Sequence, residues 1–165
     1  MPALPQDVVG YWRNAGPRRW FRKDAAFDDA LRLRFEPVHF AAARGQYDDW
    51  AQEAEPALAL ILLLDQIPRN IFRDSAHAFA TDGKARRIVR LALRRGFDLQ
   101  VEPELRHFVY MPLEHSEDLD DQVDCVRLMQ ALCAETGDGE TLRFAEMHRD
   151  IIQRFGRFPH RNAVL

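Results

Sequence analysis

The stretch Ala57-Leu-Ala-Leu-Ile-Leu-Leu-Leu64 decides the fold, because it is apolar around the whole circumference of a helix. Glu55-Pro56 provides the start of this helix, since proline is favoured in a first helical turn. A bilayer-spanning helix needs roughly 20 apolar residues, and this longest apolar run is far shorter. It therefore indicates a central core helix surrounded by other helices, and no membrane partner is expected.

The polar stretch Asp65-Gln-Ile-Pro-Arg-Asn-Ile-Phe-Arg73 follows directly. Pro68 disfavours helical geometry at Ile67, which places Asp65 and Gln66 at the end of the buried helix. Polar groups in such a position need partners.

Apolar spacing predicts helices along most of the rest of the chain, and no segment shows the alternation of a strand. Asp24 is the expected N-cap of a helix ending near Gly45, and Pro103 is expected to interrupt the segment 97–111. A first short helix is expected over Val8 to Trp12. The residues expected to share one apolar face in the other helices are Phe27, Leu31, Phe35 and Val38; Ala85, Ile88, Val89 and Ala92; Leu119, Val123, Val126, Met129 and Cys133; and Phe144, His148, Ile151 and Phe155. The sequence thus predicts an all-α fold of six to eight antiparallel helices.

Length and composition favour one domain covering residues 1–165. A chain of 165 residues with 47 % hydrophobic residues buries roughly 70 % of its unfolded surface. A net charge of -3 argues against a dedicated nucleic-acid binder. The first residues lack a basic, apolar leader, so a cytoplasmic protein is expected. Cys125 and Cys133 are eight residues apart on one expected helix, too far apart for a disulfide, and are expected to be reduced packing residues.

Arginine dominates the basic residues, with 21 Arg and 2 Lys by direct count. Arginine binds carboxylate and phosphate groups in a planar, bidentate way, but a codon bias toward arginine explains the same count. Arg69, Arg73, Arg157 and Arg161 are more informative, because each follows the end of a predicted helix. If these four side chains converge, they would form a clamp for a carboxylate or phosphate. The structural alternative is that they hydrogen-bond to the last carbonyl groups of the helices. The complete set of expected ligand-binding residues is Asp65, Gln66, Arg69, Asn70, Arg73, Glu117, Asp118, Arg157, His160, Arg161 and Asn162.

A second polar stretch, Tyr110 to Gln122, combines acidic residues with a histidine. Ser116 is the expected N-cap of the helix that begins at Leu119, and the carboxylates of its first turn suit the helix dipole. Glu114 and His115 lack that explanation and are candidate proton donors or acceptors. His148 is either a core histidine or a third member of such a site. No spacing matches a known metal, cofactor or nucleophile motif, so neither a metal nor a cofactor is predicted.

Several combinations of residues carry a family resemblance. They are Trp20-Phe21 with Phe27-Asp28, Gly45 to Trp50, Leu62 to Asn70 with Phe72-Arg73, Phe79 to Asp82, Tyr110 to Asp118 with Gln122, and His148 to Asn162. On these residues the chain, from Trp20 to Leu165, resembles the bacterial family known as domain of unknown function 924. The resemblance implies an all-helical fold similar to tetratricopeptide-type helical arrays, and it implies no established activity.

Three hypotheses for function follow. The first is a small-molecule site, with or without enzymatic activity, in which arginines hold an anionic ligand and Glu114 or His115 handles a proton. The second is a helical-array module that binds a peptide or a partner protein, with a homodimer as one form. The third is that the polar stretches have a structural role alone, in which their side chains pair with one another and hold the helices together.

Overall fold

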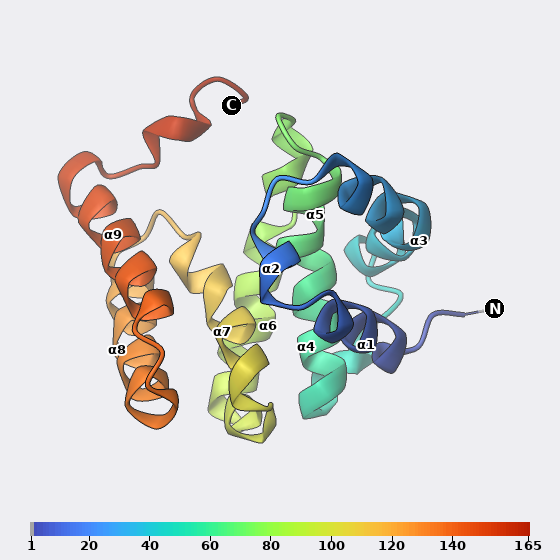
Figure 1. Cartoon of the computed structure of the whole chain (residues 1–165), viewed down its shortest axis with the longest axis horizontal. Helices are drawn as coiled ribbons and strands as arrows, with labels where there is room; N and C mark the ends of the chain where they lie inside the picture. The colour runs from blue at the N-terminus through green and yellow to red at the C-terminus, as the bar shows by residue number, and fades with distance from the viewer. Residues whose placement is uncertain (1) are drawn as a thin grey trace. The chain divides into compact units, whose positions relative to one another are not determined.

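The computed structural model describes residues 2–165, and every regular element in that range is a helix. The α-helices are Pro5–Ala15 (α1), Pro17–Trp20 (α2), Ala25–Ala43 (α3), Ala54–Leu64 (α4), Gln66–Ile71 (α5), Asp82–Arg94 (α6), Pro103–Glu114 (α7), Leu119–Thr136 (α8) and Glu140–Phe155 (α9). Short 3-10 helices are Asp48–Gln52 (η1), Ala76–Phe79 (η2), Phe97–Gln100 (η3) and Pro159–Arg161 (η4). Only α2 and α5 among the described α-helices are shorter than eleven residues. The predicted all-α class is confirmed (Figure 1).

The helices gather into two compact units, one ending at Val101 and the other running from Glu102 to Leu165. The first contains α1 to α6, and the second contains α7 to α9. Each unit is compact by itself, so the division neither confirms nor contradicts a single domain. The single domain predicted for residues 1–165 therefore stays a prediction.

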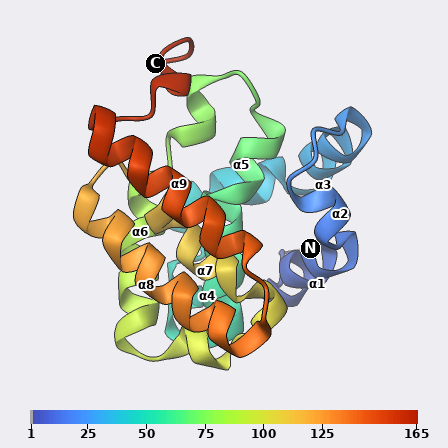
Figure 2. The same ribbon diagram turned by 60° about the vertical axis from the view of Figure 1, so that its left-hand side comes forward.

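Helix α4 forms the core of the first unit. Every residue from Ala57 to Leu64 is buried, as the sequence predicts. The helix contacts α1, α3, α5 and α6, and both ribbon views show it between α1 and α6 (Figures 1 and 2). Each fully buried leucine or isoleucine stabilises the fold by about 1.5–3 kcal/mol, so this one helix accounts for much of the hydrophobic stabilisation of its unit.

Helix α3 begins as predicted, because the Asp24 carboxylate accepts a hydrogen bond of 3.1 Å from the backbone N–H of Phe27. Phe27, Leu31 and Phe35 are buried, also as predicted. Val38 is only half-buried, and the fully buried position beside it belongs to His39. A histidine can take this core position because its ring is hydrogen-bonded there.

The expectation that Pro68 keeps Ile67 out of a helix is wrong. Asp65 ends α4 with φ -115° and ψ -67°, and a second helix, α5, starts at once with Gln66. Pro68 then lies in the first turn of α5, where its missing N–H removes no intrahelical hydrogen bond. Asp65 does lie at the end of the buried helix, as expected.

The carbonyl groups at the end of α4 receive hydrogen bonds from side chains. His39 contacts the carbonyl oxygen of Leu63 at 2.7 Å, and the Thr81 hydroxyl donates to that of Leu64 at 2.5 Å. The last carbonyls of a helix lack intrahelical partners, so these bonds satisfy groups that burial would otherwise leave costly. Thr81 precedes α6, whose Ala85, Val89 and Ala92 are buried as predicted, whereas Ile88 is only half-buried.

In the second unit, α7 is longer than the sequence suggests. Pro103 starts the helix instead of interrupting its segment, since proline fits a first helical position. The helix then continues through Pro112 to Glu114, and all of its residues from Leu105 onward are buried. Helix α7 contacts both α8 and α9, and these last two helices lie side by side (Figure 2).

The inward faces of α8 and α9 agree only in part with the predicted ones. In α8, Val126 and Met129 are buried as predicted. Leu119 and Val123 are exposed, and Gln122 and Cys125 are buried in their place. A polar side chain can turn inward here because the amide of Gln122 is hydrogen-bonded. The residues of α9 that are buried are Ala145 and Ile152, so Phe144 and Phe155 were wrongly placed in the core.

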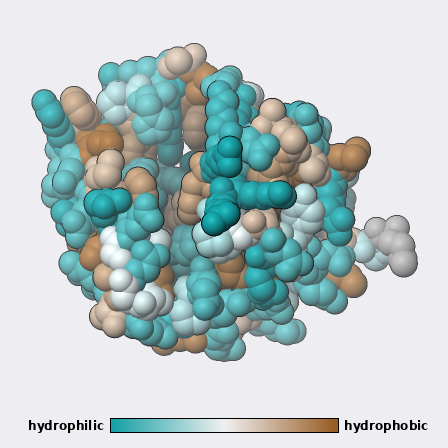
Figure 3. Space-filling view, in the orientation of Figure 1, coloured by the Kyte–Doolittle hydropathy of each residue, from teal (hydrophilic) through white to brown (hydrophobic). Residues whose placement is uncertain are grey.

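Cys125 and Cys133 are both free thiols, as expected. The face of the molecule in Figure 3 is mostly hydrophilic, with hydrophobic residues in small separate patches. Within residues 2–165, none of the helices combines the length and the apolar character that crossing a bilayer requires.

Candidate functional site

Arg69 is held by two carboxylates of its own unit. Its guanidinium group makes a bidentate contact with Asp82, at 2.7 and 2.9 Å, and a further contact of 3.2 Å with Asp65. All three side chains are largely buried. Bidentate arginine–carboxylate pairs are strong and directional, so this geometry gives Arg69 a sufficient structural role.

Arg73 is engaged by Asp28 of α3 in a similar way. Its Nε donates to Asp28 Oδ2 at 2.6 Å, and the Asn70 amide donates to Asp28 Oδ1 at 3.1 Å. Gln66 extends the network by donating to Asn70 Oδ1 at 3.2 Å. The five predicted residues Asp65, Gln66, Arg69, Asn70 and Arg73 therefore do gather around α5, but they bind one another and two further aspartates.

Asp28 and Asp82 are partners that residue-by-residue reasoning missed. Each lies in the first turn of a helix, where a carboxylate already has an explanation in the helix dipole. Their burial was the missing signal, and burial depends on tertiary packing. The network favours the structural alternative for Arg69 and Arg73. The predicted clamp that would join them to Arg157 and Arg161 involves both units, and it stays a prediction.

In the second unit, Gln122 organises the turn between α7 and α8. Its fully buried amide nitrogen lies within hydrogen-bonding distance of the carbonyl oxygens of Glu114, at 2.6 Å, and of Ser116, at 2.7 Å. These carbonyls belong to the segment that carries His115. Gln122 is thus a positioning residue for the candidate site, and in the sequence it was marked as the last residue of the second polar stretch and by its place in the family pattern.

Ser116 is not the N-cap of α8, contrary to expectation. Asp118 caps the helix, because its carboxylate accepts from the backbone N–H groups of Asp120, at 2.8 Å, and Asp121, at 3.4 Å. Ser116 instead donates to the Asp121 carboxylate at 2.7 Å and accepts from the Asp118 N–H at 3.1 Å. Asp118, predicted as a ligand-binding residue, has a structural explanation here.

His148 of α9 is the most informative residue of the unit. Its Nδ1 lies 2.7 Å from the carbonyl oxygen of Phe144. Since a carbonyl only accepts, Nδ1 carries a hydrogen, and the neutral ring has its lone pair on Nε2. Glu114 Oε2 lies 3.9 Å from the same Nδ1, and the rings of His115 and His148 are 6.4 Å apart. The three predicted catalytic residues Glu114, His115 and His148 are therefore neighbours.

Phe158 joins the segment after α9 to this group. Its backbone N–H donates to Glu117 Oε2 at 2.6 Å, and its ring lies 5.5 Å from the ring of His148. The ring of His160 is also 5.5 Å away, and the Arg161 guanidinium lies over the Phe158 ring at 4.7 Å. Phe158 was not among the predicted site residues, although it is buried and its ring contacts those of His148 and His160.

Arg161 connects the segment after α9 to the end of α7, because its guanidinium donates to the carbonyl oxygen of His115 at 2.9 Å. Arg161 is buried, whereas Arg157, His160 and Asn162 are exposed. We define the histidine cluster as Glu114, His115, His148, Phe158, His160 and Arg161. Among the described residues, no group of three or more histidine, cysteine or acidic side chains is arranged to hold a metal ion.

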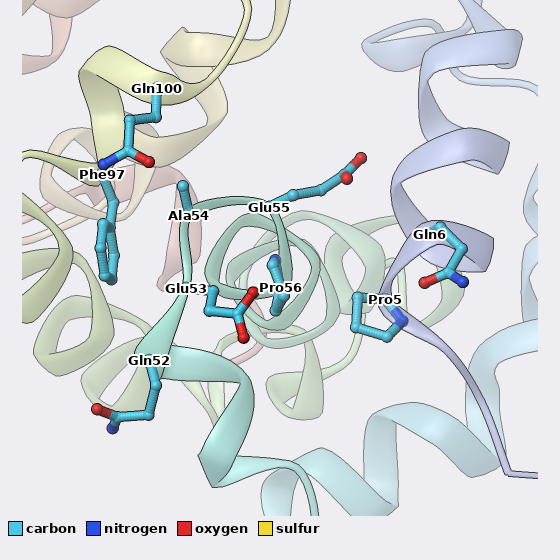
Figure 4. A pocket seen from close by; sticks show the side chains of 9 residues that line it. All are labelled: Pro5, Gln6, Gln52, Glu53, Ala54, Glu55, Pro56, Phe97 and Gln100. Atoms are coloured by element: carbon cyan, nitrogen blue, oxygen red, sulfur yellow. The ribbon is translucent and has the colours of Figure 1, made fainter.

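A pocket of the first unit lies elsewhere, at the start of α4. It has a volume of about 520 Å³ and is lined by Pro5, Gln6, Gln52, Glu53, Ala54, Glu55, Pro56, Phe97 and Gln100. Figure 4 shows Glu53 and Pro56 at the first turn of α4, with Gln6 on one side and Phe97 on the other. No predicted site residue lines this pocket, and its two carboxylates do not suit an anionic ligand.

The fold and the pattern of polar residues define an all-helical protein with one carboxylate–arginine network and one histidine cluster. The chain belongs to the family of bacterial proteins of unknown function called DUF924, which matches over residues 8–165. It is similar to the solved structure of a protein of unknown function from Agrobacterium tumefaciens, with 51 % sequence identity and a TM-score of 0.92. That match covers 97 % of this chain and 88 % of the other. No curated protein matches the chain. The predicted family is thereby confirmed.

Proposed function

We propose that the histidine cluster binds a small molecule carrying a carboxylate or phosphate group, and that His148 exchanges a proton with it. The observation that supports this proposal best is the position of His148. A carbonyl oxygen fixes its Nδ1, and two further histidines and an arginine act on its ring. These residues come from the end of α7, from α9 and from the segment that follows α9.

Electrostatics of the cluster favour an anion. The pKa of His148 is lowered from its ordinary value, first by burial and then by the positive influence of His115, His160 and Arg161, against the opposing effect of its bond to Phe144. Burial disfavours a charge of either sign, whereas the positive influence of His115, His160 and Arg161 also favours a negative ligand. The neutral ring keeps a basic nitrogen at neutral pH, as a general base requires.

Glu114 places a carboxylate beside His148 in the cluster. It is buried at the end of α7, and its carboxylate lies 3.9 Å from His148. A carboxylate at this distance stabilises the imidazolium that forms when His148 takes a proton. His148 would therefore accept the proton, and Glu114 would stabilise the resulting charge.

The test is an NMR titration of the histidine side chains with inorganic phosphate and with acetate. Binding beside His148 should raise the pKa of its imidazole, because the bound anion stabilises the charged ring. The exposed residue His160 offers a variant, His160→Gln, that should weaken binding severalfold without unfolding the unit. Arg143→Gln, at an exposed position of α9 in the same unit, is the control and should bind as the wild type does. An unchanged His148 titration at millimolar phosphate would contradict the proposal.

A second candidate is a surface that binds a peptide or a partner protein, as the helical-array hypothesis expects. The observation in its favour is a row of exposed apolar side chains on α9, namely Phe144 (44 % exposed), Met147 (49 %) and Phe155 (52 %). Arg143 and Arg154 lie over the rings of Phe144 and Phe155, so an acidic amphipathic helix would match this row. Line broadening of the α9 amide signals with such a peptide, lost in Phe144→Ser, would support this candidate over the first.

A further inference from the structure

The first unit contains a pair of histidines outside both polar groups described above. His39 of α3 and His77 of η2 approach each other with their Nε2 atoms 3.1 Å apart, and their rings are nearly perpendicular. His39 is completely buried, whereas His77 is half-buried. The pair is therefore anchored on one side and accessible to solvent on the other.

The tautomer of His39 follows from its other contact. Its Nδ1 lies 2.7 Å from the Leu63 carbonyl oxygen, which can only accept a hydrogen bond. The Nε2 of the neutral ring therefore presents a lone pair toward His77. A histidine that donates from one ring nitrogen to a backbone carbonyl and presents the other nitrogen has the arrangement of most metal-binding histidines.

We propose that His39 and His77 form a two-imidazole binding site for a divalent transition metal ion. The distance fits, because two nitrogens 3.1 Å apart, each about 2.0–2.1 Å from a metal, subtend an angle of about 100° at the ion. This angle lies between the values for neighbouring ligands in square-planar and tetrahedral coordination. For the metal to bind at Nε2 of His77, the hydrogen of that neutral ring moves from Nε2 to Nδ1, so both imidazoles bind the ion in the neutral form.

The surroundings of the pair suit such an ion. The rings of Phe40 and Phe72 lie 5.2 and 5.7 Å from that of His39, which gives the nitrogens an apolar shell. Burial lowers the pKa of His39, so protons compete weakly with a metal for its ring. Glu36 acts on His39 electrostatically and contributes negative charge near the ion. No third side chain completes the coordination among the described residues, so water occupies the remaining positions.

Imidazole ligands suit zinc, copper and nickel, and copper binds most tightly in this series. The wild-type chain should therefore take up one Cu²⁺ per molecule, with electron paramagnetic resonance showing coupling to two nitrogens, and Zn²⁺ should compete for the same site. Binding should be tighter at pH 8 than at pH 6, because protons compete with the metal.

The decisive variant is His77→Gln, because its half-buried position tolerates substitution better than that of His39. It should weaken Cu²⁺ binding by about tenfold or more and leave a single coupled nitrogen. Gln153→Ala in the other unit is the control, because this exposed side chain belongs to neither group of histidines, and it should keep the wild-type affinity and spectrum. Circular dichroism should show that both variants remain helical. The proposal is wrong if the wild type binds neither ion, or if His77→Gln leaves the affinity and the two-nitrogen coupling unchanged.

Discussion

In the first unit, arginines around α5 meet carboxylates, whereas in the second unit histidines around Phe158 meet backbone carbonyls and aromatic rings. Asp82 binds both ends of the Arg69 guanidinium, so the charges of that pair cancel locally. His148 is hydrogen-bonded to the carbonyl oxygen of Phe144, and His115, His160 and Arg161 act on it as positive groups. The charges around His148 are therefore not neutralised to the same degree. Polar side chains of similar sequence character thus have different surroundings in the two units. The carboxylate–arginine network joins helices, and the histidine cluster is the site for which ligand binding is proposed.

The largest expected effect comes from breaking the saturated network. Arg69→Met removes the partner of two buried carboxylates and should lower the free energy of unfolding by about 3–5 kcal/mol. The matched control is Arg13→Met, because Arg13 pairs with Glu55 on the exposed surface of the same unit and should contribute about 0–1 kcal/mol. Urea denaturation measures both. Equal losses in the two variants would show that the Arg69 network has no special role.

Acid sensitivity should distinguish the second unit. Burial lowers the pKa of His107 from 6.5 to about 4. The unfolded chain therefore binds an additional proton between these values, and stability falls as the pH drops from 6.5 toward 4. The 2.5-unit difference corresponds to about 3 kcal/mol. His107→Gln removes this contribution, so its free energy of unfolding should fall less than that of the wild type between pH 7 and 4. Parallel pH profiles for the two proteins would refute the assignment.

Gln122 links stability to the histidine cluster. Gln122→Met leaves the buried carbonyls of Glu114 and Ser116 without their amide donor and should lower the free energy of unfolding by about 1–3 kcal/mol. The NMR signals of His115 and His148 should shift as well. Gln153→Met, at an exposed position of the same unit, should change neither quantity. A stability loss without any change in the histidine signals would limit Gln122 to a purely structural role.

The smallest effect compares the two helix caps. Asp24→Ala in the first unit and Asp118→Ala in the second should each cost about 1 kcal/mol, because each carboxylate accepts from backbone N–H groups of a first turn. Asp29→Ala removes an exposed carboxylate of α3 that does not cap the helix, and its effect should be near zero. Thermal denaturation resolves these differences. A clear loss in Asp29→Ala would mean that net charge, instead of capping, dominates.

The sequence predicted those parts of the fold that depend on local physics. The apolar circumference of α4 and the Asp24 cap follow from residue type and spacing, and both are confirmed. The inward face of α8 could not be predicted, because Gln122 points inward only where α7 offers it carbonyl acceptors. Pro68 shows the same limit. Proline disfavours helical geometry at the preceding residue, Ile67, but a new helix, α5, begins at Gln66 and includes both residues.

The sequence predicted most residues of the candidate sites, but it did not predict which of them lie together. Asp65, Arg69 and Arg73 do gather, as do Glu114, His115 and His148, but the sequence placed all of them in one site. Asp28 and Phe158 were missed because their importance depends on which distant side chains reach them. Contacts of this kind connect residues more than 40 positions apart, and no local pattern encodes them.

The complete burial of α4 from Ala57 to Leu64 also makes this segment a reporter for the unit around it. Since every one of these residues is buried, their amide protons should exchange with deuterium only when the whole unit opens. Their exchange rates would then measure the global free energy of the first unit without any denaturant. A slower rate on adding a ligand or a metal ion would reveal binding to the folded form, even when the affinity is weak.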